Sequence, residues 1–203
     1  MALAGVLALH LLNAPAALAD DFKWVGREKE VALFERWIPS RNGTQVRELK
    51  AVFVVHAEMQ VVVRGLKEES RGTRWNVSAA DFRILQTARA NQWISYIRYD
   101  IPWPLDDQDC CLKYQLAGND NRKVIQFASI LNQRFPVTAG IDRITGVRGK
   151  WILQNQGDHT TKVVYLITTD QSKKVPRWLS DRIIHHNIYE TMAAFKAMAE
   201  HAV

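Results

Sequence analysis

Apolar and polar residues alternate with a period of two over most of the middle of the chain, which is typical of strands that bury one face. The alternation predicts strands at residues 29–37, 46–55, 82–115 (more than one strand), 124–131, 149–155 and 162–169. Clusters of Gly, Asn, Asp and Pro separate several of these segments, and such clusters favour turns. Consecutive strands joined by short turns indicate an antiparallel meander with one apolar face.

Two segments have helical periodicity instead. Apolar residues recur three or four positions apart between 57 and 71, and a helix of about 25 residues is predicted after Pro176, which suits a first helical turn. The apolar stripe of this last helix consists of Ile184, Ile188, Met192, Phe195, Ala199 and Ala202.

The terminal helix must bury this stripe, and the apolar face of the sheet is the only large partner that the pattern offers. A twisted sheet that grips a helix can enclose an apolar cavity, and such cavities bind apolar ligands. We therefore expect an α+β fold in which a curved antiparallel sheet wraps around the C-terminal helix, with an internal apolar tunnel between them.

Residues 1–19 differ from the rest because they contain no Lys, Arg, Asp or Glu. An apolar run from Leu3 to Leu12 is followed by Pro15 and by small residues at Ala17 and Ala19. This pattern predicts a cleavable signal peptide over 1–19 and one domain over 20–203. The alternative is a buried or membrane-anchoring N-terminal helix.

The formal net charge is +6, which favours approach to anionic surfaces. Basic residues are nevertheless spread along the chain among acidic ones, so an ordinary solvated surface is expected. The two cysteines, Cys110 and Cys111, are adjacent. Neighbours on a strand point to opposite faces, so we expect Cys110 to face inward, Cys111 to face outward, and no conventional disulfide.

Catalytic motifs are not evident: the sequence has no nucleophile elbow, phosphate-binding loop, zinc-binding histidine pair or dinucleotide fingerprint. His185 and His186 are adjacent and would point about 100° apart on a helix, which does not suit a shared metal. Asp106, Asp107 and Asp109 crowd one loop without the ligand spacing of a calcium site. We expect no enzyme activity, no cofactor and no metal.

Residues 96–109, which read Y-I-R-Y-D-I-P-W-P-L-D-D-Q-D, resemble a strand–loop–strand passage of START domains. These are the lipid-transfer domains related to steroidogenic acute regulatory protein. Residues 140–144, 151–154 and 175–179 resemble, in order, the family's G-x-x-R stretch, its W-x-L strand and the start of its last helix. The resemblance implies a helix-grip fold whose tunnel holds a sterol, a phospholipid or another lipid.

One departure from the family concerns its R-D pair, which is Gln108-Asp109 here. We expect Asp109 to form a structural ion pair with Arg143, the arginine of the G-x-x-R match. Some sterol-binding members place an acid and a base in the tunnel, whereas Ser95 and Tyr114 occupy the corresponding inward positions in this chain. No charged pair is expected there, which argues against a sterol.

The inward positions of the strands and the last helix are the candidate ligand-binding residues, and Ser95 and Tyr114 are the candidates for contact with a head group. They are Trp93, Ser95, Ile97, Tyr99, Leu112, Tyr114, Leu116, Trp151, Ile188 and Met192. The same residues could instead pack a solid core. Trp103, between two prolines, is a candidate lid or membrane-contact residue, with ordinary loop packing as the alternative.

The expected function is binding, and possible transfer, of a lipid or another hydrophobic small molecule. One alternative is an enzyme like the polyketide cyclases and aromatases of the same superfamily, which would need polar groups facing the tunnel. Another is a protein-interaction module without a cavity. We expect a monomer that contacts membrane surfaces transiently and does not bind nucleic acid. Export without other domains indicates the periplasm of a Gram-negative bacterium, or secretion.

Overall fold

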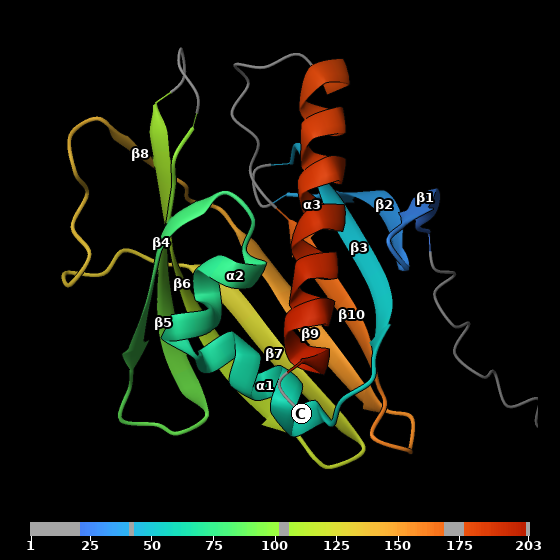
Figure 1. Cartoon of the computed structure of the whole chain (residues 1–203). Coiled ribbons are helices and arrows are strands. Elements are labelled where there is room, and N and C mark those ends of the chain that lie inside the picture. The colour runs from blue at the N-terminus through green and yellow to red at the C-terminus, as the bar shows by residue number, and fades with distance from the viewer. Residues whose placement is uncertain (1–20, 41–42, 102–105, 169–176, 202–203) are drawn as a thin grey trace, which may run out of the picture.

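The computed structural model describes residues 21–40, 43–101, 106–168 and 177–201 (Figure 1). The segment 1–19 and Trp103 therefore lie outside the described residues. The elements, in chain order, are β1 (Lys23–Glu28), β2 (Val31–Pro39), β3 (Gln45–Val55), α1 (Met59–Lys67), η1 (Glu69–Arg71), α2 (Gly72–Trp75), β4 (Ala79–Gln86), β5 (Gln92–Tyr99), β6 (Asp107–Gly118), β7 (Arg122–Ser129), β8 (Ile141–Arg143), β9 (Arg148–Asn155), β10 (Thr161–Thr168) and α3 (Arg177–Glu200).

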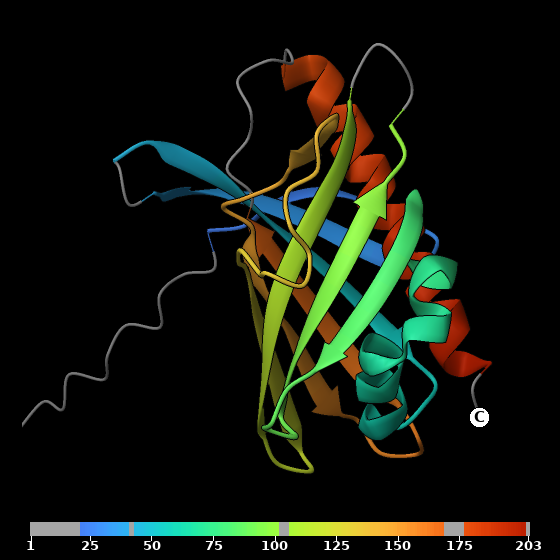
Figure 2. The ribbon, with the colours of Figure 1, turned by 90° about the vertical axis from the view of Figure 1, so that its left-hand side faces the viewer.

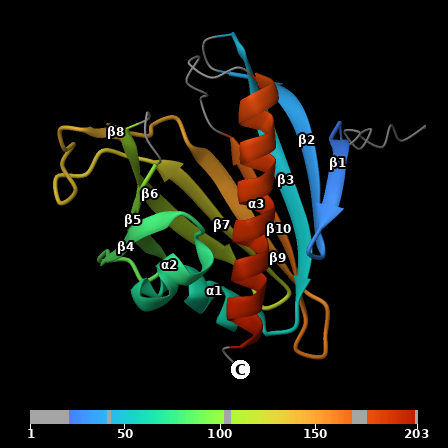
Figure 3. The ribbon, with the colours of Figure 1, turned by 45° about the horizontal axis from the view of Figure 1, so that its top comes forward.

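The strands form one sheet in the order β1-β2-β3-β10-β9-β7-β6-β5-β4, with β8 paired to β6 off this path. Every pairing is antiparallel except that of β8 with β6. The sheet curves so that β4–β6 stand on one side of α3 and β1–β3 on the other (Figures 2 and 3). The predicted α+β helix-grip fold is confirmed.

The core lies between the concave face of the sheet and the three helices. Trp75 of α2, Trp151 of β9 and Phe195 of α3 meet there, with the Trp75 and Phe195 ring centroids 5.1 Å apart and those of Trp151 and Phe195 4.9 Å apart. All three side chains are buried. Aromatic rings packed at such distances bury large areas and fix the helices to the sheet.

Several predicted elements have different bounds in the structure, and two of the differences follow from the backbone conformation. The strand predicted at 29–37 begins at Val31, because Lys29 and Glu30 adopt positive φ angles of 48° and 64° and form the turn between β1 and β2. The helix predicted over 57–71 stops at Lys67, where Glu68 takes an extended conformation. The turn at Lys29 and Glu30 has a general reason, because consecutive residues with positive φ suit the tight turns that join antiparallel strands.

Cys110 and Cys111 are on opposite faces of β6, as strand alternation requires, but Cys111 is fully buried. The segment after β7 covers it: the Ile130 amide donates a hydrogen bond of 2.9 Å to the Cys111 carbonyl oxygen. Phe135 of the same segment stacks on Tyr96, the β5 partner of Cys111, with ring centroids 4.7 Å apart. The outward position predicted for Cys111 is therefore not solvent-exposed, because this part of the sheet is covered on both faces.

Among the described residues, no helix is both long enough and apolar enough to cross a bilayer. Within the same part of the chain, no three His, Cys, Asp or Glu side chains come together in a way that could hold a metal ion.

Candidate ligand-binding site

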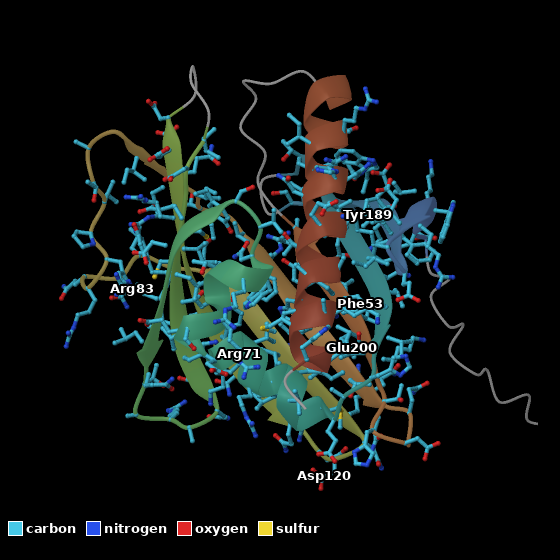
Figure 4. The ribbon with its side chains drawn as sticks, in the orientation of Figure 1. Phe53, Arg71, Arg83, Asp120, Tyr189 and Glu200 are labelled. Carbon is cyan, nitrogen blue, oxygen red and sulfur yellow. The ribbon has the colours of Figure 1, made fainter. Side chains whose placement is uncertain are left out.

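The candidate site lies between the concave face of the sheet and α3. The backbone of α3 comes close to α1, α2, β2 and β3, whereas β5, β6 and β7 form the opposite wall. In Figure 4, Phe53 of β3 and Tyr189 and Glu200 of α3 mark the side on which the helix approaches the sheet.

Of the ten residues predicted to bind a ligand, nine lie on β5, β6 or α3, and the tenth, Trp151, lies on β9. Register places Trp93 opposite Tyr114, and Ser95 opposite Leu112, so that the side chains from β5 and β6 share one concave face. Tyr99, Leu116 and Ile188 are half-buried and the other seven are buried. Burial alone does not separate a tunnel wall from a solid core, so their role as ligand contacts stays a prediction.

Aromatic side chains that the sequence analysis did not single out extend this wall across the sheet. Trp93 stacks on Tyr114 with centroids 5.0 Å apart, and Tyr114 is followed by Phe127 of β7 at 5.5 Å. Phe127 in turn stacks on Tyr165 of β10 at 5.9 Å. The period-two alternation of 124–131 and 162–169 was the signal that could have identified Phe127 and Tyr165 as inward-facing residues.

The polar groups of the β5–β6 wall are hydroxyls and one thiol. The Ser95 hydroxyl donates a hydrogen bond of 3.5 Å to the Tyr114 hydroxyl oxygen. Burial raises the pKa of Tyr99 to about 12, although a hydrogen bond from the Asn76 amide lowers it. Burial also raises the pKa of the Cys110 thiol to about 12. These groups are therefore neutral near pH 7, and the wall carries no charge.

A charged cluster is present at a place that the sequence analysis did not consider. Arg47 of β3 has a side chain that is 3% exposed, and its Nη1 donates a hydrogen bond of 2.7 Å to Asp181 of α3. Glu35 lies 3.5 Å from the same nitrogen and 3.4 Å from His185 Nε2. Ser95 and Tyr114, where a charged pair was sought, do remain uncharged. The signal for Arg47 was its place in the alternation with Leu49, Ala51 and Phe53.

Asp109 and Arg143, predicted to interact, form a buried ion pair on the convex side of the sheet. Their side chains are 1% and 6% exposed. Arg143 Nη2 donates hydrogen bonds to Asp109 Oδ2 at 2.8 Å and to the Phe135 carbonyl oxygen at 3.1 Å. The hydrogen bond with Asp109 raises the pKa of Arg143. The pair holds β8 and the covering segment on β6, and does not face the candidate site.

Two hollows are lined by described residues, one of them in part by Phe53 of β3 and Lys196 of α3. One of about 260 Å³ is bordered by Arg27, Val54 and Lys162, among others. The other, of about 460 Å³, lies between the start of α1 and the turns β6–β7 and β9–β10, where His159 contacts Glu58 at 3.0 Å.

Comparison with solved structures shows the same fold in several proteins. A fragment of a STAR-related lipid transfer protein from Xanthomonas axonopodis is 19% identical with a TM-score of 0.76, covering 89% of this chain and 99% of that one. Human StAR-related lipid transfer protein 5 is 14% identical with a TM-score of 0.72, covering 90% and 88%. An aromatase/cyclase from a Streptomyces species, Zhui, is 14% identical with a TM-score of 0.56, covering 76% and 94%.

These identities establish the fold alone. No curated protein sequence matches the chain. The family model described as START domain matches residues 23–202, which is most of the chain and includes every strand and helix described above. Membership in this family supports binding of a hydrophobic ligand. The chain belongs to the START domain family.

Proposed function

We propose that this protein binds one lipid, or a similar hydrophobic small molecule, between the concave face of the sheet and α3, and exchanges it with membranes. The observation that carries the proposal is the uncharged wall of β5 and β6 within a START domain. Each concave position of these strands, from Trp93 to Tyr99 and from Cys110 to Leu116, bears an apolar, hydroxyl or thiol side chain.

The energetics of such a wall favour an amphipathic ligand with a long apolar part. Transfer of hydrocarbon from water gains roughly 25 cal/mol per Å². A polar head group left without a partner in the same place costs about 1–3 kcal/mol, so Ser95 and Tyr114 would fix its position by hydrogen bonding. Met192 suits the opposite side because its unbranched side chain adapts to different ligand shapes.

We propose a carrier rather than an enzyme. General acid–base catalysis works best when the pKa of the catalytic group is near the working pH. Burial raises the pKa of each titratable group of the β5–β6 wall, Tyr99, Cys110 and Tyr114, to about 12 for the first two, so all three would stay protonated. Arg47 is held by carboxylates in an ion pair. This argues against the cyclase alternative.

We also propose that the mature protein acts as a monomer outside the cytoplasm, in a bacterial periplasm or after secretion. The apolar, uncharged composition of residues 1–19 supports export. Trp103, which lies outside the described residues, stays a proposed point of membrane contact.

The test is native mass spectrometry of the purified protein, with organic extraction to identify any bound lipid. We expect one lipid per chain. Ile188→Trp should lower occupancy by about tenfold or more, because Ile188 packs against the core and an indole there occupies volume that the ligand needs. Ile183→Trp is the matched control, since Ile183 is 50% exposed on the same helix and should leave occupancy unchanged.

If the folded wild-type chain yields no lipid under any expression condition, the carrier function is wrong. The two variants are compared only if their unfolding curves match that of the wild type. If Ile188→Trp folds and keeps full occupancy, the ligand lies elsewhere.

A further inference from the structure

The convex face of the sheet collects basic side chains that are dispersed in the sequence. Over β1, β2, β3, β10, β9 and β7, strand register assigns one set of alternating positions to the core and the other to this outer face. We call the basic residues of this set the outer basic face. They are Arg27, Arg36, Lys50, Arg122, Arg148, Lys150 and Lys162.

Acidic side chains are almost absent from the same positions. The described outward positions of these six strands include one carboxylate, Glu48, which lies 2.6 Å from Arg36 in an ion pair. Arg27, Arg122, Arg148, Lys150 and Lys162 form no ion pair with any described residue. Strand alternation therefore gathers on one face basic side chains that are scattered along the chain.

Acidic side chains occur on the opposite side of the molecule, around α3. Asp181, Glu190 and Glu200 are on α3, and Glu35 faces that helix from β2. Glu200 also accepts a hydrogen bond of 2.8 Å from the His56 amide at the end of β3 (Figure 4). Each of these acids pairs with a basic side chain, Lys29, Arg47 or Lys196, whereas five cations of the outer basic face have no such partner among the described residues. An anionic surface would attract the outer basic face.

Apolar side chains lie between the cations of the outer basic face. Trp24 is 58% exposed and packs edge to face on Phe34, with ring centroids 5.1 Å apart. Lys50 Nζ lies 4.7 Å from the centre of the Phe34 ring. Val54 is 40% exposed. Aromatic and aliphatic groups beside lysine and arginine are suited to the boundary between lipid head groups and acyl chains.

A shallow recess lies at one end of this face, where β3 extends beyond β2. It has a volume of about 260 Å³, and its charged lining residues are Arg27, Lys162, Lys196 and Glu30, beside His56 and apolar side chains of β2 and β3. Lys196 pairs with Glu30 at 3.3 Å, which leaves Arg27 and Lys162 as the two cations available to a single phosphate-bearing head group.

We infer that the outer basic face is a docking surface for membranes that contain anionic lipids. The inference goes beyond ligand binding, because it concerns a surface on the other side of the sheet from the candidate site. Positive charges spread over six strands match laterally mobile lipid head groups, each of which can move to a cation. The exposed apolar side chains between those charges favour a bilayer over a highly charged polymer.

The test compares vesicles of phosphatidylcholine with and without phosphatidylglycerol, using flotation of the full chain. The wild type should bind the anionic vesicles, with a partition coefficient that falls as salt increases. The variant Arg122→Gln/Lys150→Gln/Lys162→Gln should lower that coefficient by at least about tenfold, since each basic residue near an anionic surface contributes measurably. The control Arg64→Gln/Arg74→Gln/Arg89→Gln removes equal charge from exposed positions on α1, α2 and the β4–β5 turn. It should change the coefficient by no more than about twofold.

Equal losses in the two variants would show that net charge, not this face, controls binding, and would overturn the inference. The inference would also be overturned if the wild type did not bind anionic vesicles at low salt. That holds even if the wild type bound an acidic protein or a nucleic acid instead. Native mass spectrometry of the outer-face variant separates the two proposals, because its lipid occupancy should equal that of the wild type even when docking is lost.

Discussion

Among single residues, Asp109 and Arg143 have the most specific structural role that the described contacts reveal. Arg143 joins three parts of the chain, because it pairs with Asp109 of β6 and donates hydrogen bonds to the carbonyl oxygens of Phe135 and Pro136. Tyr96 lies beside the pair, and burial, with Asp109 as the second cause, raises the pKa of its hydroxyl. A charge in this position cannot be removed without leaving its partner buried.

We expect Asp109→Asn to lower the free energy of unfolding by about 3–5 kcal/mol, because Arg143 would remain buried without a counter-charge. Arg143→Gln should have an effect of similar size. The double variant Asp109→Asn/Arg143→Gln should lose much less than the sum, and urea denaturation of all four proteins measures this coupling. Strictly additive losses would show that the two side chains act independently.

Residue roles were predictable from the sequence where they followed from alternation or from a family motif. Alternation identified the inward positions from Trp93 to Leu116, and the G-x-x-R match identified Arg143. The burial of Cys111 could not be predicted, because it depends on the segment 130–147 folding back over β6. The Arg47–Asp181 contact joins residues far apart in the chain, and nothing in the pattern near either residue indicates the other.

Among elements, the connection from β3 to β4 differs most from the sequence prediction. Helical periodicity predicted one helix over 57–71, whereas the structure has α1, the short η1 and α2. Gly72 begins α2 at a place where it packs directly on the Phe82 ring of β4. The chain turns at Glu68, so that α2 can bring Trp75 onto Phe195 of α3.

We expect Gly72→Ala to lower the free energy of unfolding by about 1–3 kcal/mol, because a β-carbon there would overlap the Phe82 ring. Gly65→Ala is the matched control within α1. A β-carbon at Gly65 would lie 2.7 Å from the end of the flexible Met198 side chain, which can move, and alanine favours the helix by about 1 kcal/mol. Thermal and urea unfolding measure both variants. Equal losses of stability would show that the contact between Gly72 and the Phe82 ring is not the cause.

Strand existence was predictable because a half-buried strand leaves a period-two record in its own residues. The order of the strands in the sheet could not be predicted in the same way. The pairing of β3 with β10 brings Val55 opposite Thr161, and no local pattern encodes such a distant partner. The three-residue β8 was missed for a similar reason, since it is too short to show a period and depends on its pairing with Asp107–Asp109.

For the whole molecule, the buried hydroxyl and thiol groups of the concave wall make the folded protein less stable at alkaline pH. Burial raises the pKa of Cys110 from 9.0 to about 12, and that of Tyr99 from 10.0 to about 12. Burial raises the pKa of Tyr114 and Tyr165 as well. In the unfolded chain these groups release protons at their ordinary pKa values, while the folded chain retains them. Stability is therefore fully present below about pH 9 and declines as the pH approaches 12.

The expected decline is at most about 1.4 kcal/mol per pH unit for each such group. Cys110→Ala should flatten the first part of the decline, just above pH 9, because the thiol has the lowest unfolded pKa of the set. Urea denaturation at several pH values measures the slope for both proteins. Identical slopes would mean that the Cys110 thiol ionises as readily in the folded as in the unfolded protein.

The position of β10 beside β3 has a consequence for how the chain acquires its structure. A polypeptide emerges from the ribosome from its N-terminus, so β1–β3 are complete while the strand that must join the edge of β3 has not yet been made. Contacts of such long sequence separation form late and slow folding. Until β10 and α3 arrive, the nascent chain presents an open strand edge and an uncovered apolar surface, which are the features that chaperones bind and that aggregation exploits.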